Sequence, residues 1–212
     1  MKSEKKLVDF KLYLITDRRL FPDDYSLFTA VEEALKGGVQ AVQLREKDLE
    51  TRRLLSMAYS LRELTSGYRA KLFINDRVDV ALAVDADGVH LGGESMPAFA
   101  ARKAAGEAML IGVSAHSIEE AKKAEAEGAD FVTLGPVFET PSKIRYGHPL
   151  GPELLREARG KISIPVFAIG GIKKERVGSV LESGASGIAL ISAILGSEDI
   201  RSNTEEFMRL LK

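Results

Sequence analysis

The chain has 212 residues, of which 45% are hydrophobic and 29% charged, a composition typical of a folded domain rather than a disordered chain. Its 30 basic and 31 acidic side chains leave a net charge of -1, which argues against non-specific nucleic-acid binding because that binding requires a basic surface. The absence of cysteine excludes disulfides, thiolate nucleophiles and zinc–thiolate sites, and three histidines argue against a histidine-rich metal site.

The apolar segments are too interrupted for a signal peptide and too short for a membrane helix. Asp9 and Lys11 break the apolar stretch over residues 7–15. The run over residues 187–195 is under half of the ~20 residues that a membrane helix needs. We therefore expect a cytoplasmic protein with no membrane or nucleic-acid partner.

Short apolar or β-branched runs bounded by Gly, Asp or Pro recur along the chain, and they are typical of parallel strands covered on both faces. The predicted strands span residues 11–16, 41–45, 72–75, 88–91, 110–115, 131–137, 166–170 and 187–192. Amphipathic segments between them predict helices, for example over residues 49–64, 77–84 and 153–158. The clearest helix covers residues 117–126, where Ser117 and Glu120 form a capping box and Gly128 follows.

A weak internal repeat favours a closed arrangement of these strands. A turn followed by a strand recurs at residues 38–44, 85–91, 128–134 and 184–190, which contain the second, fourth, sixth and eighth predicted strands. This recurrence indicates an α/β fold of the (β/α)8 or TIM-barrel type. The alternative is a doubly wound sheet, whose glycine-rich fingerprint does not follow the first strand. We predict one TIM-barrel domain over residues 1–212, with an N-terminal extension at 1–10 and a C-terminal helix at 197–212.

Polar residues gather at the carboxyl ends of the predicted strands, where TIM barrels carry their chemistry. Alternation places Gln43, Arg45 and Lys47 on one side of the second strand, and the third strand ends in Asn75 and Asp76. Arg45 and Lys47 could instead be solvated rim charges, and Asp76 could simply cap the helix over residues 77–84.

The three histidines carry weaker signals. His116 follows the fifth strand, where we expect it to cap or to form a local hydrogen bond. His90 alternates with apolar neighbours, which is typical of a histidine inside a strand. His148 lies in a loop and has no assigned role.

Two oxyanion sites are suggested by the strand ends. Gly170-Gly171 and the Ile191-Ser192 turn offer backbone N–H groups and a short helix N-terminus, as in the phosphate cradle of many barrels, with Lys143 as a cationic cover. Arg45 and Lys47 beside Asp76 suggest a second anion site, where a carboxylate among cations suits Mg²⁺ bridging diphosphate oxygens. The pattern predicts two phosphorylated substrates, one of them a diphosphate.

Several motifs, in this order, resemble the thiamine-phosphate synthase family. They are Gln-Leu-Arg-Glu-Lys (43–47), Ile-Asn-Asp-Arg (74–77), Asp-Gly-Val-His-Leu-Gly (87–92), Gly-Val-Ser-Ala-His-Ser (112–117), Gly-Pro-Val-Phe-Glu-Thr-Pro-Ser-Lys (135–143), Ala-Ile-Gly-Gly-Ile (168–172) and Ile-Ser-Ala-Ile (191–194). The resemblance runs from Tyr13 to about Leu195 and implies a TIM barrel. It also implies a transferase that joins a pyrimidine diphosphate to a thiazole phosphate, giving thiamine phosphate and pyrophosphate. In this reaction pyrophosphate leaves first.

The resemblance implies a role for each polar residue of these motifs. The pyrimidine diphosphate would be held by Gln43, Arg45, Lys47 and Asn75, with Ser114 contacting the pyrimidine and Asp76 binding Mg²⁺ as cofactor. Thr140, Ser142 and Lys143 would meet the substrates from a loop, while the Gly171 amide and the Ile191–Ser192 turn would take the thiazole phosphate. The predicted catalytic residues are Arg45, Ser114 and Lys143.

One departure from the family pattern leaves other functions open. The family usually carries an acidic pair after His-Leu-Gly, but here Gly93-Glu94-Ser95 follows, so either Ser95 or Glu94 stands in for the second metal ligand. A sister group, the thiazole tautomerases, shares this departure, needs no metal and uses a histidine at the position of His116. The alternatives are therefore a tautomerase or a non-catalytic thiazole-phosphate-binding relative. The sequence leaves the oligomeric state open.

Overall fold

The computed structural model describes residues 7–140 and 149–212. Parallel strands close into a barrel in sequence order, and β1 pairs with β8 through Leu12 and Ile188. The strands are β1 (Leu12–Ile15), β2 (Ala41–Leu44), β3 (Lys71–Asn75), β4 (Gly88–Leu91), β5 (Leu110–Ala115), β6 (Phe131–Leu134), β7 (Val166–Ile169) and β8 (Gly187–Leu190). The closed order confirms the predicted TIM barrel and excludes the doubly wound sheet.

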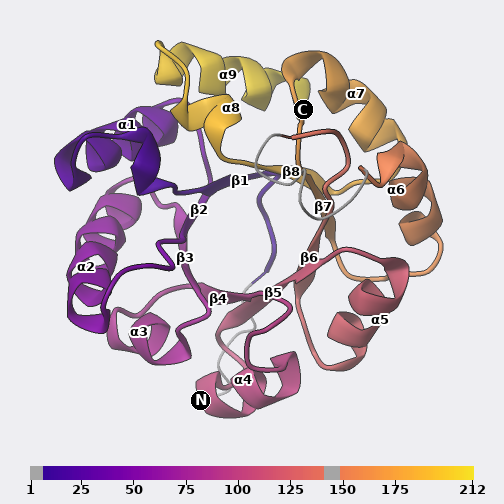
Figure 1. The fold of residues 1–212 in the computed structure, drawn as a ribbon, viewed down its shortest axis with the longest axis horizontal. Helices are drawn as coiled ribbons and strands as arrows, with labels where there is room; N and C mark the ends of the chain where they lie inside the picture. The colour runs from indigo at the N-terminus through magenta and orange to yellow at the C-terminus, as the bar shows by residue number, and fades with distance from the viewer. Residues whose placement is uncertain (1–6, 141–148) are drawn as a thin grey trace.

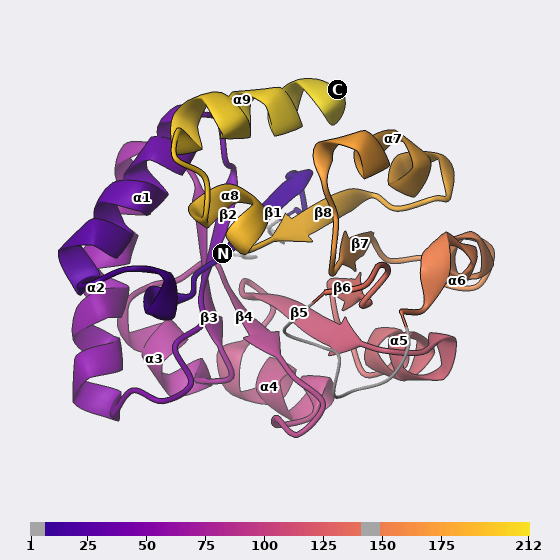
Figure 2. The same ribbon diagram turned by 45° about the horizontal axis from the view of Figure 1, so that its top comes forward.

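Helices surround this barrel on the outside, in a ring that follows the chain from α1 to α9 (Figure 1). They are α1 (Asp24–Lys36), α2 (Thr51–Gly67), α3 (Val78–Ala83), α4 (Ala98–Ala105), α5 (Ile118–Ala126), α6 (Gly151–Arg159), α7 (Lys174–Glu182), α8 (Ser192–Leu195) and α9 (Ile200–Leu210), with a 3-10 turn at Arg18–Leu20. The short α8 follows directly on β8, and α9 packs against α1 and α7 (Figure 2).

Most element boundaries fall within a few residues of the predictions, and the differences have local causes. The strand predicted to reach residue 137 ends at Leu134, because Pro136 lacks the N–H that a ladder requires. The strand predicted to reach residue 192 ends at Leu190, because Ile191 is already the N-cap of α8. The predicted cap is confirmed: the Ser117 side chain accepts a hydrogen bond from the Glu120 N–H at the start of α5.

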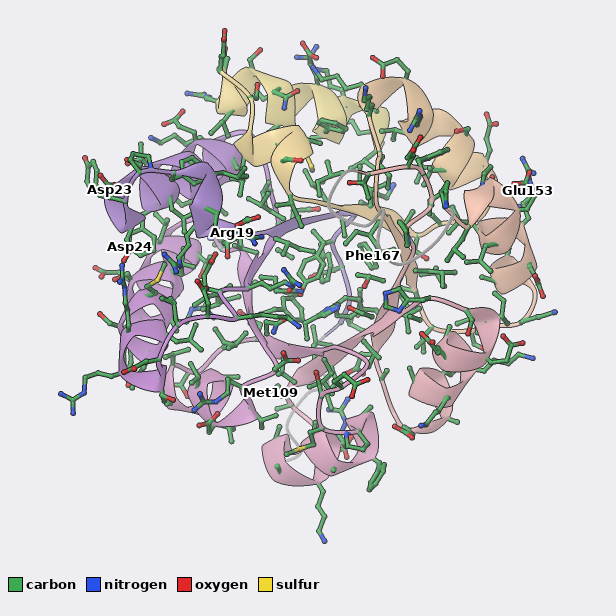
Figure 3. The ribbon with its side chains drawn as sticks, viewed as in Figure 1. Arg19, Asp23, Asp24, Met109, Glu153 and Phe167 are labelled. Carbon is green, nitrogen blue, oxygen red and sulfur yellow. The ribbon has the colours of Figure 1, made fainter. Side chains whose placement is uncertain are left out.

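The barrel contains two separate apolar cores. The larger lies between the strands and the helices, and the smaller fills the inside of the barrel with aromatic rings. Figure 3 shows Phe167 toward the middle of the barrel and Glu153 at the periphery. Glycines on neighbouring strands make room for the rings: a Cβ on Gly88 would lie 2.5 Å or less from Phe73, and one on Gly112 would lie 2.4 Å from Phe131 Cζ. The large rings therefore fill the space that the glycines leave open, which gives the dense packing that protein interiors require.

Phe10 closes the amino-terminal end of the barrel. It is 3% exposed and packs at 5.0–5.7 Å, measured between ring centroids, against the rings of Tyr13, Phe73, Phe131 and Phe167. The predicted N-terminal extension over residues 1–10 therefore ends in a core residue, because the open end of the barrel would otherwise expose apolar side chains. Within the described ranges, no helix combines the length and the apolar character needed to span a bilayer.

Candidate active site

The carboxyl ends of β2, β3 and β4 bring several of the predicted site residues together. Asp76, directly after β3, lies at the centre of this group and adopts a left-handed φ of 61°. Its Oδ2 accepts a hydrogen bond from Asn75 Nδ2 at 2.6 Å and lies 3.7 Å from Lys47 Nζ. Left-handed backbone is uncommon for residues other than glycine and is often found at functional sites, although Asp and Asn tolerate it best.

The Asp76 carboxylate faces the barrel mouth instead of capping the next helix. Arg77 is the N-cap of α3, and among the described residues no side-chain hydrogen bond caps that helix. The second carboxylate oxygen, Oδ1, accepts hydrogen bonds from the Gly92 N–H at 3.3 Å and from the Ser95 hydroxyl. The capping interpretation of Asp76 is therefore wrong, and the carboxylate links the loops after β3 and β4.

Ser95, rather than Glu94, is the residue of its loop that meets Asp76. Glu94 is exposed, whereas the Ser95 hydroxyl contacts both the Asp76 carboxylate and the Gly92 N–H. No group of three or more His, Asp or Glu side chains that could hold a metal exists within residues 7–140 and 149–212. A carboxylate beside a hydroxyl nevertheless fits Mg²⁺, which commonly takes one or two carboxylates and completes its shell with substrate phosphate and water.

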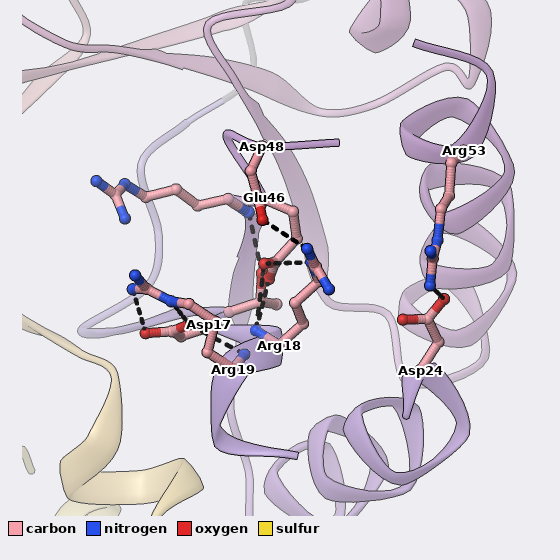
Figure 4. A network of polar contacts seen from close by, with 9 residues as sticks. Asp17, Arg18, Arg19, Asp24, Glu46, Asp48 and Arg53 are labelled. Carbon is pink, nitrogen blue, oxygen red and sulfur yellow. Dashed lines mark hydrogen bonds and ion pairs between the residues drawn. The ribbon is translucent and has the colours of Figure 1, made fainter. Parts of the chain in front are cut away.

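A buried carboxylate, Glu46, fixes the loop that carries Arg45 and Lys47 (Figure 4). Its Oε1 accepts hydrogen bonds from the Thr16 hydroxyl at 2.6 Å and from the Arg18 N–H at 3.1 Å. The Thr16 oxygen in turn accepts the Arg45 N–H at 3.0 Å. Burial raises the pKa of Glu46, an effect that its hydrogen bonds from Thr16 and Arg18 oppose. Glu46 thus ties the end of β1 to the end of β2 and holds the backbone between the two cations.

Polar side chains also line the inside of the barrel below this rim. Gln43 is 1% exposed and donates from Nε2 to the Tyr13 hydroxyl at 3.0 Å. His90 contacts that hydroxyl through Nδ1 at 3.4 Å and Ser114 Oγ through Nε2 at 3.0 Å. His90 is therefore inside its strand, as predicted, and it lies beneath one of the predicted substrate contacts.

Burial controls the ionisation of these inner groups. It lowers the pKa of His90 to about 3, and the nearby positive charges of Arg45 and Lys47 act in the same direction while Asp76 opposes them. Burial also raises the pKa of Tyr13. Both side chains are therefore neutral near neutral pH, and the charges of the rim act on the polar floor below it.

The predicted phosphate cradle lies at the ends of β7 and β8. Gly170 and Gly171 have φ values of 96° and 63°, and a Cβ on Gly171 would lie 2.5 Å from the Glu139 carbonyl oxygen. Glycine is thus required at residue 171 by both conformation and space. Ile191 is the N-cap of α8, and Ser192, its first residue, is exposed.

The remaining residues singled out in the sequence are Thr140, Ser142, Lys143, His116 and His148. Thr140 is half-buried at the end of the described β6 loop, whereas Ser142, Lys143 and His148 lie outside the described residues. His116 forms the local hydrogen bond that the sequence predicted. Glu120 Oε2 accepts the His116 backbone N–H at 2.7 Å and lies 3.3 Å from its Nδ1.

A separate cavity of 480 Å³ lies between α1 and the start of α9. Its lining includes Phe21, Tyr25, Thr29 and Ile200 but none of the predicted site residues that the structure describes. It therefore belongs to a different part of the surface from the barrel mouth.

Comparison with known proteins decides the family. A sequence model described as thiamine monophosphate synthase matches residues 12–194, which is nearly the whole barrel. The chain belongs to the thiamine monophosphate synthase family. A relative in Geobacter sulfurreducens is 53% identical over 96% of this chain and 95% of its own length. The thiamine-phosphate synthase of Clostridium novyi is 50% identical over 92% of this chain and 95% of its own. The solved thiamine phosphate pyrophosphorylase from Pyrococcus furiosus is 48% identical, with a TM-score of 0.85 and 95% of each chain covered.

Membership of the thiamine monophosphate synthase family confirms the predicted family, barrel and enzyme class, a transferase. The structure adds residues whose part in the site the sequence did not indicate, namely Tyr13, Thr16 and Glu46. The position of Glu46 in the sequence could have indicated this role. A carboxylate that directly follows a buried strand needs hydrogen-bond or ionic partners, because burying an unpaired charge is costly.

Proposed function

We propose that the chain joins a pyrimidine diphosphate to a thiazole phosphate, giving thiamine phosphate and pyrophosphate. The observation that supports this most is the rim around Asp76, where a carboxylate, a hydroxyl and the Lys47 ammonium lie together above a polar barrel floor. A diphosphate with a bound cation needs oxygen ligands for the cation and positive charge for its remaining oxygens. The rim offers both.

In this proposal the bond between the pyrimidine methylene carbon and the diphosphate oxygen breaks first, and its electron pair leaves with pyrophosphate. The thiazole nitrogen then forms the new C–N bond with its lone pair, so the chain does not need a nucleophile of its own. The chain's contribution is to orient the two rings and to stabilise the charge of the leaving group. Arg45 and Lys47 supply that charge on the β2 side, and Asn75 adds an amide.

The magnesium proposal rests on the same rim. Asp76 and Ser95 would hold Mg²⁺, with substrate oxygens and water completing its shell. The ion, when bound, supplies positive charge at the leaving diphosphate. Lys143, predicted to cover a phosphate, would add a further cation.

The thiazole phosphate is assigned to the other side of the mouth. The Gly171 amide and the amides at Ile191 and Ser192 would donate to its oxygens, because a phosphate is held well by convergent N–H groups. Glycine at residue 171 lets the loop after β6 pack against this turn, because a Cβ would lie 2.5 Å from the Glu139 carbonyl oxygen.

The experiment measures thiamine phosphate formed from both substrates and Mg²⁺ by the wild-type chain, by Asp76→Asn and by His116→Ala. Asn tolerates the left-handed backbone of residue 76 and has nearly the same shape, so the variant removes the charge with little change in volume, and far-UV circular dichroism checks that the fold is retained. We expect Asp76→Asn to lower kcat/KM at least about 100-fold, because a metal-binding carboxylate is lost. His116→Ala, which loses only a local contact, should stay within about threefold of wild type.

Absence of thiamine phosphate would reject the proposal. The substitution of Ser95 for a second acid gives one specific alternative, the thiazole tautomerase. Turnover of a thiazole carboxylate phosphate in EDTA, abolished by His116→Ala, would assign the chain to that isomerase. Tight thiazole phosphate binding without turnover of either substrate set would assign it to a regulatory relative.

A further inference from the structure

A continuous chain of hydrogen-bonding groups crosses the floor of the barrel from β2 to β5. Gln43 Nε2 lies 3.0 Å from the Tyr13 hydroxyl, which lies 3.4 Å from His90 Nδ1. His90 Nε2 lies 3.0 Å from Ser114 Oγ. The two ends of this series of hydrogen bonds, Gln43 and Ser114, are predicted substrate contacts. Its two middle members, Tyr13 and His90, have no role in the proposed chemistry.

The direction of each hydrogen bond follows from counting protons. The Gln43 amide N–H donates to the Tyr13 oxygen, so the Tyr13 hydroxyl proton is left to donate to His90 Nδ1. A neutral imidazole carries a single N–H, which must then be on Nε2. There it donates to Ser114 Oγ at 3.0 Å, the nearer of two hydroxyls, since Thr133 Oγ1 lies 3.5 Å from the same nitrogen. Thr133 Oγ1 is a second donor to Ser114 Oγ at 3.4 Å. With both of its acceptor positions engaged, Ser114 has only its own proton left to offer.

At the Gln43 end of this series of hydrogen bonds, an acceptor lacks a donor. Gln43 Oε1 is buried and has no hydrogen-bond partner among the described residues. A buried acceptor without a donor costs free energy, and a ligand that supplies an N–H relieves that cost. The floor therefore presents an acceptor at Gln43 and a donor at Ser114.

We propose that Tyr13 and His90 are positioning residues that fix this hydrogen-bond polarity, so that the ring on the floor meets an acceptor at Gln43 and a donor at Ser114. This rests on the proposed function, in which that ring is the pyrimidine half. A ring with an amino group and an unprotonated ring nitrogen satisfies both residues, because the amino group donates to Gln43 Oε1 and the nitrogen accepts from Ser114. An oxo group in place of the amino group would set two acceptors against each other at Gln43 Oε1.

The backbone around His90 supports a fixed ring. Gly112, opposite on β5, would bring a Cβ to 2.6 Å from His90 Nδ1, so glycine there opens the space for the imidazole. The ring also packs 5.6 Å from Tyr13 and 5.8 Å from Phe131, measured between centroids. His90 is thus held from the sides as well as at both nitrogens.

The tautomer is read directly from ¹⁵N NMR of the full-length chain labelled on histidine, because protonated and unprotonated ring nitrogens have well-separated shifts. The chain has three histidines, and loss of one signal set in His90→Gln assigns the residue. We expect a proton on Nε2 and none on Nδ1. A proton on Nδ1 alone would reverse the polarity and overturn the proposal.

Kinetics test whether the polarity matters for the substrate. Gln at residue 90 can place an N–H near the position of Nε2, whereas Asn can reach only the position of Nδ1. We expect His90→Gln to keep the KM for the pyrimidine diphosphate within about threefold, and His90→Asn and Tyr13→Phe to raise it about tenfold, the effect of one lost hydrogen bond. The KM for thiazole phosphate should not change in any of them. Tyr59→Phe is the control, since its hydroxyl meets the Ala83 carbonyl on the surface.

The outcomes separate this inference from the proposed function. Equal KM values for His90→Gln and His90→Asn in an active enzyme would overturn the positioning role while the synthase assignment stands. If the wild-type chain forms no thiamine phosphate, the proposed function fails. The inference is then decided by the tautomer together with calorimetric binding of the aminopyrimidine diphosphate and its oxo analogue. Preference for the amino compound supports the inference, and equal binding rejects it.

Discussion

Acid should destabilise the chain through His90, and the size of the effect follows from its burial. The pKa of His90 is about 3 in the folded chain against an ordinary value of 6.5, so between these values the unfolded chain binds one more proton. Stability therefore falls as the pH falls through this window, by up to ~1.4 kcal/mol for each pH unit. Between about pH 7.5 and about pH 4.5, His90 alone should remove about 2.6 kcal/mol from the free energy of unfolding.

The assay is urea unfolding followed by far-UV circular dichroism, on the wild type and on His90→Gln. Carboxylates also titrate in acid, but they do so in both proteins, and the difference between the two curves isolates His90. We expect the wild type to lose about 2.6 kcal/mol more than the variant over that interval. Parallel curves, or His90 ring signals that titrate near pH 6.5 in the folded chain, would refute the reasoning.

Two further pairs of substitutions, each a test with its control, examine the packing inside the barrel and the contacts of Glu46. Gly112→Ala places a Cβ 2.4 Å from Phe131 Cζ and should destabilise the chain by about 3 kcal/mol in thermal unfolding. Gly178→Ala, in α7, adds a Cβ that meets no described neighbour within 4 Å outside the backbone of its own helix, and it should instead stabilise the chain by about 0.5–1 kcal/mol. Equal effects of the two substitutions would contradict the packing argument. Glu46→Ala releases the loop between the cations and should raise the KM for the diphosphate substrate about tenfold. Asp48→Ala, which removes an exposed acid of the same loop, should leave that KM unchanged, so a similar rise in both would reject the tie.

The sequence allowed the barrel and the meeting of Lys47, Asp76 and Ser95 at its rim to be predicted, because both depend on strand periodicity. Alternation along β2 puts Gln43 inside the barrel, and the ends of β3 and β4 must meet at the same edge, which brings Asp76 to Ser95. These are consequences of register, and register is visible in a pattern of apolar and polar residues.

The rest depends on contacts between side chains far apart in the sequence. Glu46 meets Thr16 across 30 residues, and His90 meets Tyr13 across 77, so neither pair is marked by spacing. The left-handed backbone of Asp76 is also invisible in the sequence, because Asp is not glycine and no turn motif requires it. Partners of this kind are fixed by the tertiary structure, which local pattern does not encode.

The aromatic rings around Phe10 have a consequence for the way in which substrates enter and products leave. Because the described rings around Phe10 fill the amino-terminal end of the barrel, we expect substrates and products of the proposed reaction to pass through the mouth at the carboxyl ends of the strands. In the proposed reaction pyrophosphate and thiamine phosphate would then leave through the same mouth that admits the two substrates. Retention of the leaving group beside the newly formed bond would then allow the reverse reaction until one product escapes.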